Sequence, residues 1–191
     1  MIALQKPLVL ASNSPRRKQL LADAGFHFSV EVLPTDECFP ADLPAAEVAA
    51  HISHEKSKMF RGLRSESIVL TADTVVIADN QILGKPSDAV DAGRMLRLLS
   101  GRSHTVVTAI SMLTDGEIQT VSDAAKVYFR KLDDSEISYY IENYKPFDKA
   151  GAYGIQEWIG MTGIEKIEGS FYTIMGLPVH VVYRLLKPYF Q

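Results

Sequence analysis

Two arginines occupy positions where a helix would favour acidic residues. Ser14 and Pro15 indicate a helix start, because serine caps free N–H groups and proline needs no N–H at the first helical position. Arg16 and Arg17 then fall in the first turn, at the positive end of the helix dipole, where a cation costs about 0.3–1 kcal/mol. Free N–H groups beside two guanidinium groups favour an anion, most simply phosphate. Two surface arginines on an amphipathic helix are the alternative interpretation.

A carboxylate interrupts an apolar run that is typical of a strand. Asp73 lies within Ile68 to Ala78, although aspartate is depleted from strands and a buried unpaired carboxylate costs several kcal/mol. A cation, a metal ion or exposure in a cleft must compensate it. Asp73 is therefore a candidate general base or Mg²⁺ ligand, and an aspartate bonded to backbone N–H groups is the alternative. Thr74 beside it also fits an ordinary strand position.

Further polar groups are candidates to complete such a site. The loop acids Asp36 and Glu37 carry hard oxygen donors that could hold a divalent cation together with Asp73. Lys56 lies near the edge of a buried helical stripe, and Lys85 precedes a proline in an extended segment. Solvated side chains are the alternative at each of these positions.

The segment 148–156 (DKAGAYGIQ) is rich in small residues. Its two glycines and two alanines allow a ligand to approach the backbone closely. Lys149 supplies a cation at one end, and Gln156 at the other end carries an amide that suits the edge of a nucleotide base. A tight structural turn is the alternative.

Helices and strands alternate along the chain, which predicts a mixed α/β sheet with helices on its faces. The hydrophobic patterns predict helices at 15–24, 44–60 and 88–100, one opened by Asp133 and Glu136, and one starting at Pro178. The expected strands are 8–10, 26–33, 68–78, 82–83, 104–113 and 118–132, with a hairpin across 164–175.

Composition narrows the function classes. The chain has 191 residues, a net charge of −3 and 47% hydrophobic residues, which argues against general nucleic-acid binding and against disorder. Cys38 is the only cysteine, so no intramolecular disulfide forms and a reducing compartment fits. No apolar stretch reaches membrane-spanning length. We therefore expect a cytoplasmic protein.

Ordered motifs from Leu8 to Pro188 resemble the Maf family of nucleoside triphosphate pyrophosphatases. The motifs are ASNSPRR at 11–17, DE at 36–37, EK at 55–56, TADTVV at 71–76, GKP at 84–86, SGRSH at 100–104, DKAGAYGIQ at 148–156 and GSFYTIMGLP at 169–178. The resemblance implies that residues 1–191 form one domain similar to inosine triphosphate pyrophosphatases. That fold is an elongated mixed sheet flanked by helices, with two lobes around a cleft. It also implies a homodimer.

The activity implied is metal-dependent hydrolysis of a nucleoside triphosphate to its monophosphate and pyrophosphate. Asp73 would be the base and, with Glu37, would hold Mg²⁺ or Mn²⁺. The matching phosphate or metal contacts are Ser12, Arg16, Arg17, Glu37, Lys56 and Lys85, with Lys149 a further candidate. Arg16, Thr74 and Gln156 occupy the positions that mark the branch acting on dTTP and UTP. A non-catalytic nucleotide-binding regulator of cell division and a pyrophosphatase for other modified nucleotides are the alternatives.

Overall fold

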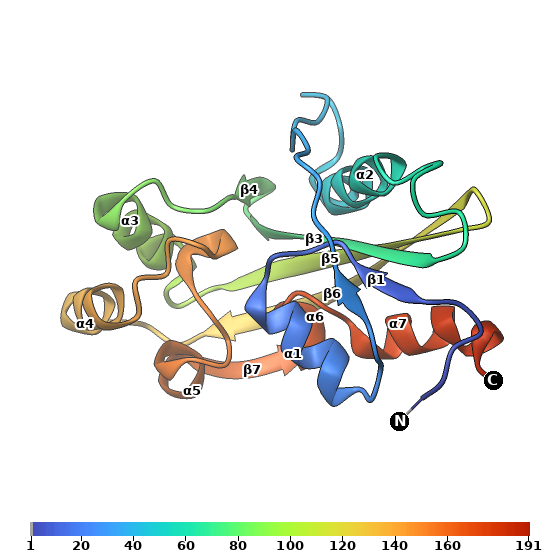
Figure 1. The fold of residues 1–191 in the computed structure, drawn as a ribbon. Coiled ribbons are helices and arrows are strands. Elements are labelled where there is room, and N and C mark those ends of the chain that lie inside the picture. The colour runs from blue at the N-terminus through green and yellow to red at the C-terminus, as the bar shows by residue number, and fades with distance from the viewer. Residues whose placement is uncertain (1) are drawn as a thin grey trace. The chain divides into compact units, whose positions relative to one another are not determined.

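A computed structural model describes residues 2–191 and shows a mixed α/β fold, as predicted (Figure 1). Its seven strands follow the order β2-β1-β3-β5-β6-β7, with β4 paired to β3. The strands are β1 (Leu8–Leu10), β2 (Ser29–Val30), β3 (Ile68–Ala78), β4 (Gln81–Leu83), β5 (Ser103–Thr114), β6 (Glu117–Phe129) and β7 (Ile164–Glu168). The helices are α1 (Pro15–Asp23), α2 (Ala45–Lys58), α3 (Ala89–Leu99), α4 (Asp134–Tyr144), α5 (Trp158–Gly163), α6 (Phe171–Ile174) and α7 (Val179–Leu186), with 3₁₀ turns η1 (Ala150–Ala152) and η2 (Lys187–Tyr189).

The chain divides into two compact units, each assembled from segments that are distant in sequence. Unit 1 comprises the chain up to Asp73 with Thr108–Asp123 and Gly176–Gln191. Unit 2 comprises Thr74–Val107 and Ala124–Met175. The candidate residues are therefore divided between the two units.

Unit 1 is built around the parallel strands β1, β2 and β3. Val9 of β1 is in register with Ser29 of β2 and Val69 of β3. Val9 and Val69 pack with Phe60 and Leu113 in a buried cluster. The described N- and C-terminal segments run side by side (Figure 1), and Gln191 N donates to Ala3 O at 3.1 Å.

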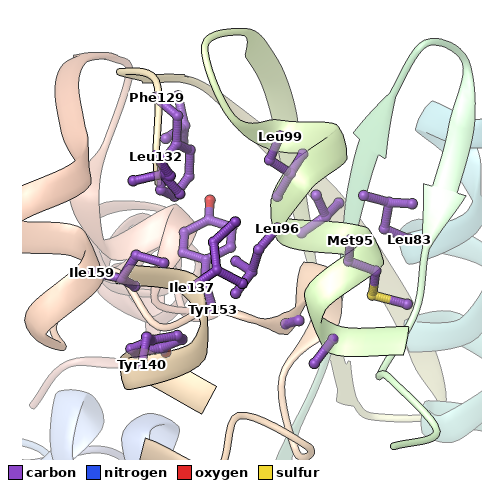
Figure 2. Close-up of a cluster of buried hydrophobic side chains, with 14 of the residues drawn as sticks. Leu83, Met95, Leu96, Leu99, Phe129, Leu132, Ile137, Tyr140, Tyr153 and Ile159 are labelled. Carbon is purple, nitrogen blue, oxygen red and sulfur yellow. The ribbon is translucent and has the colours of Figure 1, made fainter. Parts of the chain in front are cut away.

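Unit 2 has its own core, which is rich in aromatic residues. Figure 2 shows the Tyr153 ring near the middle of this cluster, with Leu96 of α3 to one side and Ile159 of α5 to the other. The Tyr153 hydroxyl lies 2.7 Å from His104 Nε2, and His104 stacks on Phe129. Burial lowers the pKa of His104 to about 4, so the imidazole is neutral at physiological pH.

Local sequence signals gave most elements correctly, with three corrections. The hairpin expected across 164–175 is wrong: β7 pairs with β6, and α6 follows Gly169. The strand expected at 26–33 shrinks to Ser29–Val30. The apolar spacing of the helix expected at 44–60 puts Met59 in its buried stripe with Val48 and Ile52, but Met59 is 48% exposed because α2 ends at Lys58. Within residues 2–191, no helix combines the length and the apolar character needed to cross a membrane.

Candidate functional site

The first turn of α1 is arranged as the sequence predicts. Ser14 caps the helix, its hydroxyl accepting from Arg17 N at 3.4 Å, and no acidic residue lies in this turn. Ser12, just before the helix, is buried and accepts from Ser14 N at 3.2 Å. Arg16 is half-buried in the same turn. The positive end of α1 therefore carries two arginines without an acidic residue among its own first-turn positions.

Arg17 ties the start of α1 to two distant segments of unit 1. Its Nε donates to Gly176 O at 2.8 Å, and its Nη1 donates to Ala72 O at 2.8 Å. Burial lowers the pKa of the Arg17 guanidinium, while the negative charge of Asp73 raises it. An arginine remains charged under such conditions, so Arg17 is a fixed positive charge bonded to Ala72, the residue directly before Asp73.

Lys56 joins the two candidate carboxylates of unit 1. Its Nζ donates to Asp73 Oδ1 at 2.8 Å and lies 2.7 Å from Glu37 Oε1. The side chains of Lys56 and Asp73 are 16% and 13% exposed, so their pairing is largely shielded from water. Glu37 reaches the same ammonium from the exposed loop before α2. Lys56 thus contacts both of the carboxylates that the sequence predicts to act together.

A row of hydroxyl groups explains why α2 presents Lys56 to Asp73. Thr71 and Asp73 share one face of β3, because side chains alternate along a strand. Ser53 and Lys56 share one face of α2, because residues three apart are neighbours on a helix. Thr71 Oγ1 donates to Ser53 O at 2.7 Å, and the Ser53 and Ser111 hydroxyls lie 2.8 Å apart. These buried hydrogen bonds fix the register of α2 on β3, with the ion pair as the next contact along.

The environment of Asp73 is one that would suit a general base. Burial raises the pKa of this carboxyl, and the nearby Lys56 and Arg17 oppose that rise. A carboxylate with a raised pKa holds an abstracted proton better than an ordinary aspartate. Its rigid placement on β3 also restricts the position of any water molecule that it orients.

The carboxylates of unit 1 fit a divalent cation shared with a ligand. Within the described residues, no group of three His, Cys, Asp or Glu side chains forms a protein-only cage. Glu37 and Asp73 converge on one ammonium, so their oxygens are close enough to bind one small cation between them. Two carboxylates plus phosphate oxygens is the donor set that Mg²⁺ prefers.

The remaining candidates belong to unit 2. Lys85 is exposed, and Thr74 is half-buried on β3 directly after Asp73. Lys149 is buried, and its Nζ contacts Asp148 at 2.7 Å and Glu157 at 3.1 Å. Gly151 N donates to Gly84 O at 3.0 Å, which brings the 148–156 segment next to the residue before Lys85.

Gln156 is exposed on the wall of a pocket in unit 2. The pocket has a volume of about 530 Å³, which lies in the usual range for small-molecule sites. Apolar side chains dominate its lining, which includes Met161, Ile164, Ile167 and Phe171. An amide beside an apolar wall is the combination that recognises the edge and the face of a planar ring.

Comparison with known proteins identifies the family of the chain. The family model described as Maf-like protein matches residues 7–189. The chain belongs to the Maf family. A dTTP/UTP pyrophosphatase of Bacteroides thetaiotaomicron is 47% identical over 182 residues, covering 94% of both chains. A dTTP/UTP pyrophosphatase of Porphyromonas gingivalis is 46% identical over 186 residues, covering 95% of this chain and 94% of the relative.

One solved structure shows a weaker likeness to this Maf-family chain. The Ham1 protein of Staphylococcus aureus aligns with a TM-score of 0.46 at 17% identity, covering 65% of this chain and 72% of that chain.

Sequence reasoning missed two polar residues of the Maf-family chain that contact the 148–156 segment. Glu157 pairs with Lys149, and Tyr140 donates to the Glu157 carboxylate. The sequence pattern of α4 indicates only an apolar position for Tyr140, and its ring does lie buried. One sequence signal could have indicated Glu157. It directly follows the small-residue segment and lies three residues after Gly154.

Proposed function

We propose that this protein hydrolyses dTTP and UTP, together with modified pyrimidine forms, to the monophosphate and pyrophosphate. The observation that carries the proposal is the convergence of Asp73 and Glu37 on Lys56 in unit 1. Relatives that match almost the whole chain are named for this activity. We also propose that residues 1–191 act as a single catalytic domain, because each unit is assembled from interleaved segments.

The phosphate chain needs positive charge, which unit 1 supplies. Arg16, Arg17 and Ser12 at the start of α1 bind phosphate oxygens, aided by the positive helix end. Lys56 moves from its carboxylate partners to the phosphate, and Lys85 and Lys149 are further candidates from unit 2. A bound Mg²⁺ or Mn²⁺ ion, held by Glu37 and Asp73, would supply charge neutralisation and polarise the phosphate.

Asp73 orients the attacking water and accepts its proton at a carboxylate oxygen. Attack at the α-phosphorus breaks the bond between the α- and β-phosphates and releases pyrophosphate. Gln156, on the wall of its pocket, donates to and accepts from the pyrimidine edge, with Arg16 and Thr74 as the other specificity residues. The homodimer implied by the resemblance and the cytoplasmic location expected from the composition stay predictions.

Pyrophosphate release from a nucleotide panel tests the proposal. With Mg²⁺ or Mn²⁺, we expect faster release from dTTP and UTP than from dATP, GTP, ITP or m7GTP, and methylated UTP and dTTP extend the pyrimidine set. Asp73→Asn should lower kcat by about 10²–10⁴-fold, the range for losing a general base. Asp79→Asn, an exposed aspartate beyond the end of β3, is the matched control. A fully active Asp73→Asn variant would refute the mechanism, and tight triphosphate binding without turnover would support a nucleotide sensor instead.

A further inference from the structure

The carboxylate of Glu157 sits at the centre of a polar cluster in unit 2. The Tyr140 hydroxyl donates to Glu157 Oε2, and Lys149 Nζ lies 3.1 Å from Glu157 Oε1. The side chains of Lys149 and Glu157 are 9% and 18% exposed, so this ion pair is largely removed from water. Breaking such a pair leaves a buried charge with less compensation, which makes the arrangement sensitive to substitution.

The backbone of the 148–156 segment closes around the same carboxylate. Gly154 N donates to the Tyr140 hydroxyl oxygen at 3.0 Å, and Glu157 N donates to Gly154 O at 3.0 Å. A Cβ added at Gly154 would lie 2.8 Å from Glu157 Cδ. Only glycine therefore allows the carboxylate to lie against the chain here.

The other part of the segment is held in an unusual conformation. Gly151 and Ala152 both have positive φ, of 69° and 59°, and the second value is costly for a residue with a side chain. The buried Tyr153 then bonds to His104 at 2.7 Å. Surrounding contacts must maintain this backbone, and the Glu157 cluster is one of them.

Gln156 is the residue directly before Glu157, and its side chain is exposed. Its neighbours on both sides, Ile155 and Glu157, have their side chains buried or half-buried. The direction of the Gln156 amide therefore follows from where Glu157 is held. A misplacement of about 1 Å in such a group is enough to weaken recognition substantially.

We propose that Glu157 is a positioning residue, which through Tyr140 and Lys149 holds the segment so that Gln156 presents its amide to the pyrimidine base. The proposal rests on the function proposed above and adds a determinant of base preference to it. Lys149 then acts through Glu157 and not by direct contact with phosphate.

The test compares Glu157→Gln and Tyr140→Phe with Glu142→Gln, an exposed glutamate on α4 that serves as control. Pyrophosphate release gives kcat and KM for dTTP and for dATP with each variant. We expect kcat/KM for dTTP to fall about 10-fold or more through KM, while kcat/KM for dATP changes less than about threefold. The ratio of kcat/KM for dTTP to that for dATP therefore falls, while the activity on dATP is largely kept. Tyr140→Phe keeps the buried ring, so it decides the matter if Glu157→Gln does not fold.

Lys149→Met separates positioning from phosphate contact. A positioning role predicts the same loss of pyrimidine preference as Glu157→Gln and a non-additive double variant. Equal losses on dTTP and dATP that add to those of Glu157→Gln would show a direct phosphate contact and overturn the proposal. An unchanged preference ratio in both Glu157→Gln and Tyr140→Phe would overturn it as well. If the unmodified protein releases no pyrophosphate from any nucleotide, the proposed function itself fails, which is a different result.

Discussion

The ammonium of Lys56 lies 2.8 Å from the carboxylate of Asp73, with both side chains mostly buried. Burial raises the pKa of the Asp73 carboxyl, and the ammonium of Lys56 opposes that rise. The lysine therefore controls the protonation state of the proposed base as well as its position.

Removing that ammonium should move the pH profile. Burial already raises the pKa of Asp73, and Lys56 limits the rise, so Lys56→Met should raise this pKa further. Activity needs ionised Asp73 and is lost as the pH falls through its pKa. We expect the acid limb of kcat/KM against pH to shift to higher pH, together with a lower plateau. Lys58 is an exposed lysine in the last turn of α2, and Lys58→Met is the control. If the acid limb lies at the same pH in both variants, Lys56 does not limit the pKa of Asp73.

The hydroxyl contact beneath the ion pair should matter for both stability and activity. Thr71→Val keeps the shape of the side chain and removes the donor to Ser53 O. We expect a loss of about 1–2 kcal/mol in the free energy of unfolding, measured in urea. We also expect a lower kcat, because α2 loses a contact that holds Lys56 in register. Thr105→Val, half-buried on β5, is the control, and a stable Thr71→Val variant with full activity would show that the register is fixed elsewhere.

The buried imidazole of His104 should make folding sensitive to acid. Its pKa falls from 6.5 to about 4 on folding, so the unfolded chain binds an additional proton between these values. This contribution to stability is complete above pH 6.5 and is lost as the pH falls toward 4, up to about 3 kcal/mol. Urea unfolding from pH 7.5 to 4.5 should show a steeper loss for the natural chain than for a His104→Phe, Tyr153→Phe double variant. Parallel curves would mean that His104 does not remain neutral in the folded protein.

Gly160 should tolerate no side chain. A Cβ at this position would lie 1.8 Å from Ile155 O, which belongs to the backbone and cannot rotate away. We expect Gly160→Ala to lower the free energy of unfolding by about 2–4 kcal/mol and to displace the segment before α5. Gly84→Ala meets nothing within 4 Å and should change stability by less than about 1 kcal/mol. Similar melting temperatures for the two variants would show that α5 can shift to admit the methyl group.

Predictions from the sequence succeeded where short-range chemistry decides the structure. Ser14 and Pro15 start α1, and Asp133 and Glu136 form the expected capping box of α4. The region after β7 went wrong for a related reason. Gly169 has a φ of 109°, which resembles a hairpin turn, but its missing side chain instead allows close approach to Ala125, and Ser170 then caps α6. Turn signals alone do not say whether a strand or a helix follows.

In the candidate site, too, residue types follow from the local sequence, whereas contacts between distant segments do not. Glu37 and Asp73 were predicted to act together, but the contact of Lys56 with both depends on how α2 packs on β3, which no local pattern encodes. The role of Glu157 depends on a tyrosine 17 residues away, in a different helix. The cleft expected between two lobes stays a prediction.

The interleaving of the two units constrains how the chain acquires its fold during synthesis. Unit 1 requires Gly176–Gln191 to be complete, and unit 2 requires residues up to Met175. Neither unit can therefore complete its long-range contacts until its last segment has left the ribosome, which is Gly176–Gln191 for unit 1 and Ala124–Met175 for unit 2. No single proteolytic cut or truncation isolates one unit, because the segments of the two units alternate along the chain.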